Sequence, residues 1–252
     1  MGAIPGPPPA HGPPLTEAAY KKELDVVADE IYEAIYIHHV MEEINRLAIE
    51  DTNILRAMNE QPLFWRAHRA ASQAALFMSL GRIFDTNDTA TSIYRLVRIT
   101  RVNLQLFSKA SLRARKVGNG TEPPWLNVYL QGIWEPQAAD DLRFLRDALK
   151  PHAKLFESAY KPIRHSVYGH RLMSDNEAGI LLFPQTNREA VGEILDFLHD
   201  LIESVNELYL NGTKPELGRD FGEYNQRVRE DARNVMRRLA GHLGSTRKET
   251  AV

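Results

Sequence analysis

The chain has 252 residues, of which 43% are hydrophobic and 25% are charged, so it is long enough to bury the core of a soluble globular protein. Its net charge of −2 excludes a global attraction to nucleic acid, and any such binding requires a local basic patch. Cysteine is absent, which excludes disulfides, thiolate catalysis and cysteine-ligated zinc and makes the cytoplasm the expected compartment. No run approaches the ~18 apolar residues of a membrane helix, and no signal-peptide pattern is present, so no membrane association is expected.

The first 14 residues contain six prolines, and proline removes a backbone donor and fixes φ. Residues 1–14 are therefore expected to form an extended, disordered leader. We expect one helical domain over 15–212, followed by an amphipathic helix and tail over 213–252.

Helical patterning begins directly after the leader. Thr16 is a candidate N-cap, and apolar residues at helical spacing predict a long helix over 17–49. Pro62 suits the first position of a helix, and a second apolar stripe predicts a helix from there to about Phe84.

The middle of the chain alternates helical patterning with turn signals. Residues 85–89 form a turn and capping cluster, and residues 90–116 predict one or two helices with Ser108 as an internal cap. Residues 117–136 are rich in glycine and proline and predict a loop or a variable insertion. Helix resumes near Ala138, with a buried face formed by Leu142, Leu145, Leu149, Ala153 and Phe156.

The C-terminal part predicts two further helices. Residues 174–186 are expected to form a loop, after which Asn187 caps a periodic helix that runs to about Leu210 and stops at Gly212. An arginine-rich amphipathic helix is expected over 220–243. Because no segment alternates with a period of two, the fold class is all-α. We expect an antiparallel bundle of four or five core helices with an extra C-terminal helix.

The chemistry of the chain concentrates in a short segment that contains Arg164, His165 and His170 and follows a possible kink at Pro162. A guanidinium beside an imidazole that titrates near neutral pH can hold a phosphate and move a proton. On one straight helix, a spacing of six leaves the two side chains roughly 120° apart. They converge only if the helix bends or a second copy supplies the other half. The alternative is a solvated, positively charged helix end.

Arginine, a polar residue, four further residues and a histidine resemble the signature of HEPN domains. Three other segments are similar to the abortive-infection AbiU-type branch of this family: residues 64–68 (FWRAH), 76–85 (LFMSLGRIFD) and 106–109 (LFSK). The likeness covers roughly residues 20–210. Some HEPN proteins carry a modified tyrosine two residues after the histidine, but Leu172 stands there in this chain.

This resemblance implies a homodimer whose signature helices line one composite cleft, and a metal-independent endoribonuclease. It assigns Arg164 to stabilising the phosphoryl charge, His170 to proton transfer, and His165 to orienting the phosphate or His170. RNA is then the substrate, an antitoxin protein is a possible partner, and antiphage defence or a toxin–antitoxin pair is the context. The alternative is a non-catalytic HEPN-like helical dimer that binds RNA or a protein partner.

Two further groups of residues are candidates for a supporting role. Arg82 and Asp85 close the second predicted helix, and they either form an ion pair at its end or support the cleft. Between Thr89 and Thr121 there are seven basic residues and no acidic ones. Within this stretch, Arg95, Arg98 and Arg101 are candidate RNA contacts, with Tyr94 and Phe107 as stacking partners. The alternative is that these cations pair with acidic residues of the first helix or of the 140–141 region.

The remaining histidines favour structural roles. His38 and His39 lie near Glu42 and Glu43, and Asp196 lies three residues before His199, but neither arrangement matches a zinc or di-iron helical motif. There is also no glycine-rich phosphate loop. We therefore expect neither a metal site nor a cofactor.

Overall fold

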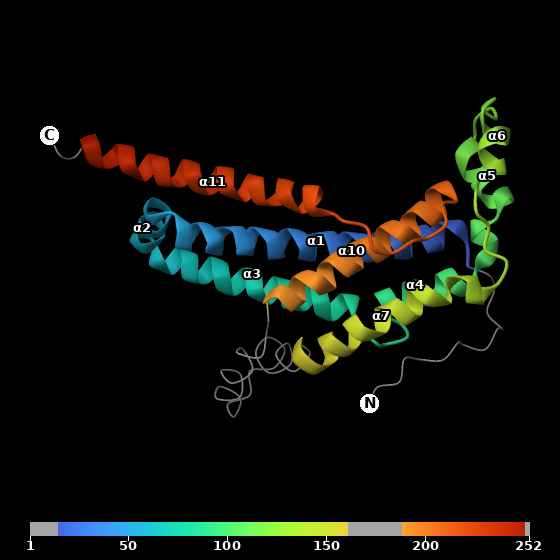
Figure 1. The fold of residues 1–252 in the computed structure, drawn as a ribbon, viewed down its shortest axis with the longest axis horizontal. Coiled ribbons are helices and arrows are strands. Elements are labelled where there is room, and N and C mark those ends of the chain that lie inside the picture. Colours follow the sequence, from blue (N-terminus) through green and yellow to red (C-terminus); the bar gives the residue numbers. More distant parts are fainter. Residues whose placement is uncertain (1–14, 161–187, 250–252) are drawn as a thin grey trace. The chain divides into compact units, whose positions relative to one another are not determined.

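A computed structural model describes residues 15–160 and 188–249 (Figure 1). Every regular element within these two ranges is helical, which confirms the prediction of an all-α fold. Contacts between residues group the chain into two compact units, described separately below. Unit 1 comprises Met1–Ile31 and Gly81–Arg219, and unit 2 comprises Tyr32–Leu80 and Asp220–Val252.

The first helices begin where the sequence predicts. Helix α1 spans Glu17–Glu50, and the hydroxyl of Thr16 accepts a hydrogen bond from the backbone N–H of Ala19 at 3.2 Å. Helix α3 spans Pro62–Ile83 and starts at the predicted proline. Between them lies a short helix that was not predicted from the sequence, α2 (Thr52–Glu60), whose N-cap is Asp51.

The next segment confirms the internal cap and corrects the predicted loop. Helix α4 (Ile93–Val102) and the 3₁₀ turn η1 (Leu104–Phe107) precede α5 (Lys109–Val117). The Ser108 hydroxyl caps α5 by accepting from the N–H of Ser111 at 3.1 Å. The loop predicted over 117–136 instead contains α6 (Leu126–Gln131). Its leucines, Leu126 and Leu130, lie on one face and are both buried, and this burial outweighs the surrounding turn formers.

The second half of the described chain has three main helices. A 3₁₀ turn, η2 (Ala139–Leu142), leads into α7 (Arg143–Leu155), whose predicted apolar face is buried as expected. Helix α10 (Arg188–Asn211) ends at Gly212, which has a positive φ of 65° as a helix-stopping glycine requires. Helix α11 (Gly222–Glu249) runs six residues beyond the predicted end at residue 243.

The core of unit 1 is organised around Tyr20 of α1, which is fully buried. Its ring lies edge-on to Phe107 at 5.4 Å and tilted against Tyr209 of α10 at 5.0 Å, measured between ring centroids. Its hydroxyl bonds to that of Thr100 in α4 at 2.9 Å, so the one polar atom of the side chain is satisfied. One aromatic residue therefore ties α1, α4, η1 and α10 together.

Helices α4 and α7 lie side by side in unit 1 (Figure 1). Stacking of Phe84, directly after α3, on Phe156, directly after α7, has ring centroids 4.8 Å apart and joins the ends of these two segments. The loop after α3 and the helices α4 and α7 thus lie around one cavity, which is described below.

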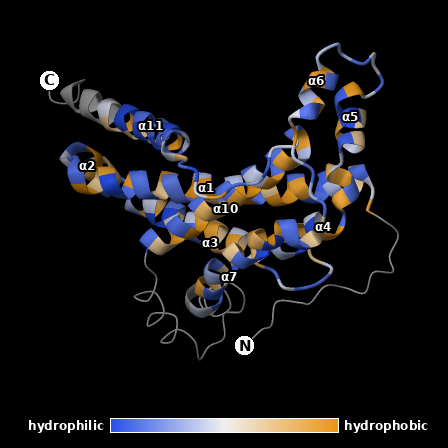
Figure 2. Cartoon of the chain, turned by 45° about the vertical axis from the view of Figure 1, so that its right-hand side comes forward, coloured by the Kyte–Doolittle hydropathy of each residue, from blue (hydrophilic) through white to orange (hydrophobic). Residues whose placement is uncertain are grey.

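Unit 2 has its own small core, formed by Leu47, Ile54, Met58 and Met236, with Trp65 packed against it. Helix α11 is largely hydrophilic (Figure 2). Its contact with α1 is partly ionic, because Arg233 donates to the buried carboxylate of Glu43 at 2.8 Å.

Some predictions concern residues that the structure does not describe. The leader over 1–14, the kink at Pro162, the loop over 174–186 and the cap at Asn187 all lie outside the described residues. The predicted division of the chain at residue 213 stays a prediction. In the described ranges, none of the helices combines the length and the apolar character needed to cross a bilayer.

Candidate functional site

The predicted catalytic group, Arg164, His165 and His170, lies outside the described residues. The last described element before it is η3 (Phe156–Tyr160), a single π-helical turn that follows α7 and ends four residues before Arg164. Isolated π-helical turns are rare and are frequent at functional sites.

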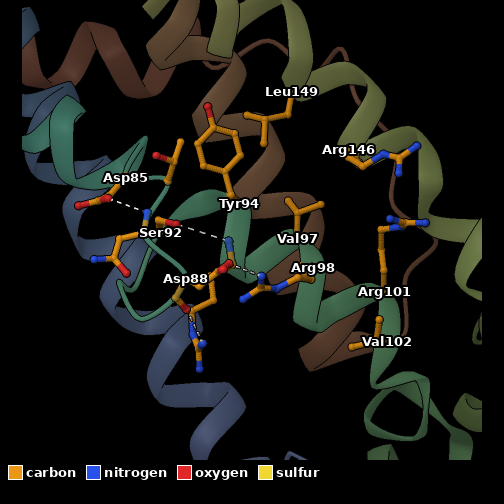
Figure 3. Close-up of a pocket in the computed structure, with 13 residues that line it drawn as sticks. Asp85, Asp88, Ser92, Tyr94, Val97, Arg98, Arg101, Val102, Arg146 and Leu149 are labelled. Atoms are coloured by element: carbon orange, nitrogen blue, oxygen red, sulfur yellow. Dashed lines mark hydrogen bonds and ion pairs between the residues drawn. The ribbon is translucent and has the colours of Figure 1, made fainter. Parts of the chain in front are cut away.

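Four of the predicted supporting residues meet at one cavity of unit 1. Asp85 from the loop after α3 lines a cavity of about 60 Å³, together with Arg95, Arg98 and Arg101 from α4 (Figure 3). In the sequence, Asp85 is a candidate for supporting the cleft because it closes the second predicted helix, and the arginines are candidate RNA contacts because they lie in the basic stretch. The fold brings them together because the loop after α3 folds back beside the first turns of α4.

Each of these arginines has a polar partner. Arg95 donates to Glu23 of α1 at 2.9 Å, and Arg98 donates to Asp88 at 2.8 Å. Arg101 donates to a backbone carbonyl at 3.3 Å, and the nearest carboxylate oxygen, on Asp140, is 4.0 Å away. Pairing with the first helix and with the 140–141 region was one of the two interpretations of this basic stretch. The pairing with the first helix is close for Arg95, and the pairing with the 140–141 region is weak for Arg101.

The residues that close α3 play separate parts. Arg82 donates twice to Glu30 of α1, at 2.6 and 2.8 Å. Asp85 accepts a hydrogen bond from the backbone N–H of Asn87 at 2.9 Å and so stabilises the turn that borders the cavity. Of the two, Asp85 faces the cavity, and Arg82 holds α3 against α1.

Arg146, which lines the same cavity from α7, was not predicted from the sequence. Its closest anion, Asp147, also serves Lys150 at 2.7 Å and Arg143 at 3.4 Å, while Arg146 lies at 3.2 Å. The Lys150 ammonium, and then Arg146, lower the pKa of Asp147 to about 2. Arg143, Arg146 and Lys150 recur at helical spacing on one face of α7, which is the signal that would have revealed this cluster.

Part of the remaining wall of the cavity is apolar, and Thr86, Asn87, Asp88 and Ser92 form a polar part. The apolar part is formed by the ring of Tyr94 and by Val97, Val102 and Leu149. Burial, and then the nearby Glu157 carboxylate, raise the pKa of Tyr94, so its phenol stays protonated at neutral pH. The cavity is thus lined by apolar side chains, by four guanidinium groups and by the two carboxylates of Asp85 and Asp88, and an apolar wall strengthens the field of such neighbouring charges.

Among the described residues, no group of three or more acidic or histidine side chains has the arrangement of a metal site. His39 contacts the guanidinium of Arg229 at 3.3 Å within unit 2. Burial lowers the pKa of His199 in α10, which favours its neutral form.

The described elements define an all-α protein. The model of the AbiU2 family of HEPN proteins matches residues 16–235. The chain therefore belongs to the AbiU2 family, whose name refers to abortive infection. Searches of curated proteins and of solved structures gave no match.

Proposed function

We propose that this protein is a metal-independent, cytoplasmic endoribonuclease that acts in antiphage defence or as the toxin of a toxin–antitoxin pair. The observation that carries the proposal is the Arg164-His165-x4-His170 segment in a chain that matches an abortive-infection HEPN family over residues 16–235. Its substrate is RNA, its working form is a homodimer, and an antitoxin protein is its expected regulator.

The proposed mechanism needs no metal because RNA carries its own nucleophile, the 2′-hydroxyl. One His170 takes the proton of that hydroxyl, and the oxygen attacks the adjacent phosphorus. The bond to the 5′-oxygen breaks, and the His170 of the other protomer gives that oxygen a proton. Arg164 stabilises the charge that develops on the phosphoryl oxygens, and His165 orients the phosphate or His170. The products carry a 2′,3′-cyclic phosphate and a 5′-hydroxyl.

A second candidate is a non-catalytic HEPN-like helical dimer that binds RNA or a protein partner. The arginine-lined cavity favours it, because its guanidinium groups and apolar side chains can hold an anion without a cleavage step. The two candidates differ in one respect, which is whether RNA is cut.

The experiment is cleavage of end-labelled single-stranded RNA in EDTA, with mapping of the product ends. We expect the wild type to cut and to leave cyclic phosphate ends, and we expect His170→Ala and Arg164→Ala to lose cleavage by a factor of about 10² or more. His11→Ala in the proline-rich segment and Arg56→Ala, exposed on α2, are the matched controls and should cut normally. If a confirmed wild-type dimer leaves a broad RNA pool intact, the second candidate replaces the first.

A further inference from the structure

Two guanidinium groups lie at the same edge of the cavity of unit 1. Figure 3 shows Arg101 of α4 and Arg146 of α7 converging on the same side, while Arg98 points away toward Asp88. Both arginines line the cavity, so their charges act on the same small volume. Two cations held in this way repel each other unless an anion lies between them.

The carboxylates near this pair are engaged by other groups or are distant. Asp88 and Asp85 line the same cavity, but Asp88 accepts from Arg98 at 2.8 Å and Asp85 accepts from the backbone N–H of Asn87 at 2.9 Å. The nearest carboxylate oxygen to Arg101 is 4.0 Å away, on Asp140, which is 80% exposed and therefore well solvated. Arg146 shares Asp147 with both Arg143 and Lys150, so three cations surround one carboxylate. The positive charge of Arg101 and Arg146 is thus compensated only in part, which favours an external anion.

The size and lining of the cavity restrict the class of anion. A volume of about 60 Å³ holds on the order of four water molecules, which suits one phosphate group. A planar guanidinium matches two phosphate oxygens at once. Val97 and Val102 offer an apolar surface beside the charges, which suits the sugar that follows each phosphate in a nucleic acid strand.

We infer that this cavity binds a backbone phosphodiester of the RNA, clamped between Arg101 and Arg146 with the adjoining ribose against Val102. The inference rests on RNA as the substrate in the proposed function and deepens it by naming a second contact along the strand. Phosphate contacts fix the register of a nucleic acid without reading its sequence. The clamp is therefore a positioning element, distinct from the residues proposed to transfer protons.

The test measures binding without cleavage, in the full chain carrying His170→Ala. The Kd of a fluorescein-labelled single-stranded RNA is measured by anisotropy over a range of salt concentrations. We expect Arg101→Ala and Arg146→Ala each to weaken binding by about tenfold and to lower the slope of log Kd against log salt by about 0.7. Arg101→Lys and Arg146→Lys should keep the slope and recover part of the affinity, because they retain the charge and lose the two-oxygen contact.

A matched pair of surface variants protects the test against misfolding. Val102 lines the cavity and is 51% exposed, so Val102→Glu places a negative charge there without disturbing the core. It should weaken RNA binding, whereas Val128→Glu on α6, where the side chain is 73% exposed, should not. Kd values and salt slopes that match those of Arg56→Ala in all the cavity variants would overturn the inference.

Competition identifies the source of the phosphate. Inorganic phosphate and AMP are added to the RNA complex and are also titrated directly into the protein. If AMP binds with a dependence on Arg101 and Arg146 while RNA affinity does not depend on them, the cavity serves a free nucleotide and the inference is wrong. RNA binding that needs both arginines, in a protein that cuts no RNA, keeps the inference and removes the proposed nuclease. RNA cleavage by the wild type, with unaltered RNA affinity in the cavity variants, keeps the nuclease and removes the clamp.

Discussion

Arg115 and Glu17, 98 positions apart in the sequence, form an ion pair in which Nη1 of Arg115 lies 2.7 and 2.9 Å from the two carboxylate oxygens. The same guanidinium donates to the backbone carbonyl of Tyr209 at 2.8 Å and lies 4.2 Å from the centre of its ring. The Tyr209 hydroxyl closes the group by donating to Glu17 at 2.7 Å. Three helices, α1, α5 and α10, therefore meet at one cation.

Replacing Arg115 with alanine is expected to destabilise unit 1 by about 2–3 kcal/mol, because Glu17 and the Tyr209 carbonyl lose charged hydrogen bonds in a partly buried site. Urea unfolding followed by circular dichroism measures the change. The matched control is Arg113→Ala on the same helix, because Arg113 and its partner Glu122 form an ion pair in which both side chains are exposed to solvent. That loss should stay below about 1 kcal/mol. Equal losses in the two variants would show that the Arg115 group contributes no more than a surface pair.

Glu43 of α1 predicts a specific pH dependence for unit 2. Its side chain is 2% exposed, and the hydrogen bond from Arg46, and then that from Arg233, lower its pKa below the ordinary value of 4.5. Because its pKa is lower in the folded state, the stabilisation is present above pH 4.5 and is lost as the pH falls through the folded pKa. The difference in unfolding free energy between wild type and Glu43→Gln should be largest at neutral pH and should shrink in acid.

Thermal unfolding between pH 7 and pH 3 measures this difference. Glu50→Gln is the control, because Glu50 is half exposed and also pairs with Arg46, so its loss should cost less than about 1 kcal/mol. A Glu43→Gln curve that runs parallel to that of the wild type at every pH would contradict the prediction.

Gly212 is expected to tolerate no side chain. Its φ is +65°, and an added Cβ would lie 2.8 Å from the Cβ of Ile133, closer than real Cβ contacts. Gly212→Ala should therefore destabilise the protein by about 1–3 kcal/mol through backbone strain and crowding. Gly120→Ala is the control, because its φ is ordinary and its nearest contact is 3.4 Å. Denaturant melts compare the two, and similar stability would refute the argument from the positive φ.

The proposed composite cleft makes a prediction for mixed dimers. If one His170 acts as base and that of the partner as acid, a dimer with a single His170→Ala protomer is inactive. Equal amounts of wild-type and His170→Ala protomers are mixed and allowed to exchange subunits. The mixture should have about a quarter of the activity of the same total amount of wild-type protein, since only wild-type homodimers cut. RNA cleavage before and after exchange measures this. About one half would indicate that each protomer works alone.

Much of the fold is predictable from the sequence because helix formation is local. The long α1, the start of α3 at Pro62, the Ser108 cap and the stop at Gly212 all follow from periodicity and capping over a few residues. Two short helices are exceptions: α2 was not predicted, and α6 lies where the surrounding glycine and proline predict a loop. Burial of Leu126 and Leu130 against Leu112 of α5 stabilises a helix that local preference alone does not favour.

The features of the candidate site also differ in whether the sequence alone predicts them. By itself, the sequence determined the fold class, the family resemblance and the Arg164–His170 signature, because each is written in neighbouring residues. Only the tertiary structure decided that Glu23 pairs with Arg95, that Asp85 lines the same cavity as the arginines of α4, and that Arg146 joins Arg101 at that cavity. The field at a site depends on distances between side chains from separate helices, and no local pattern records those distances.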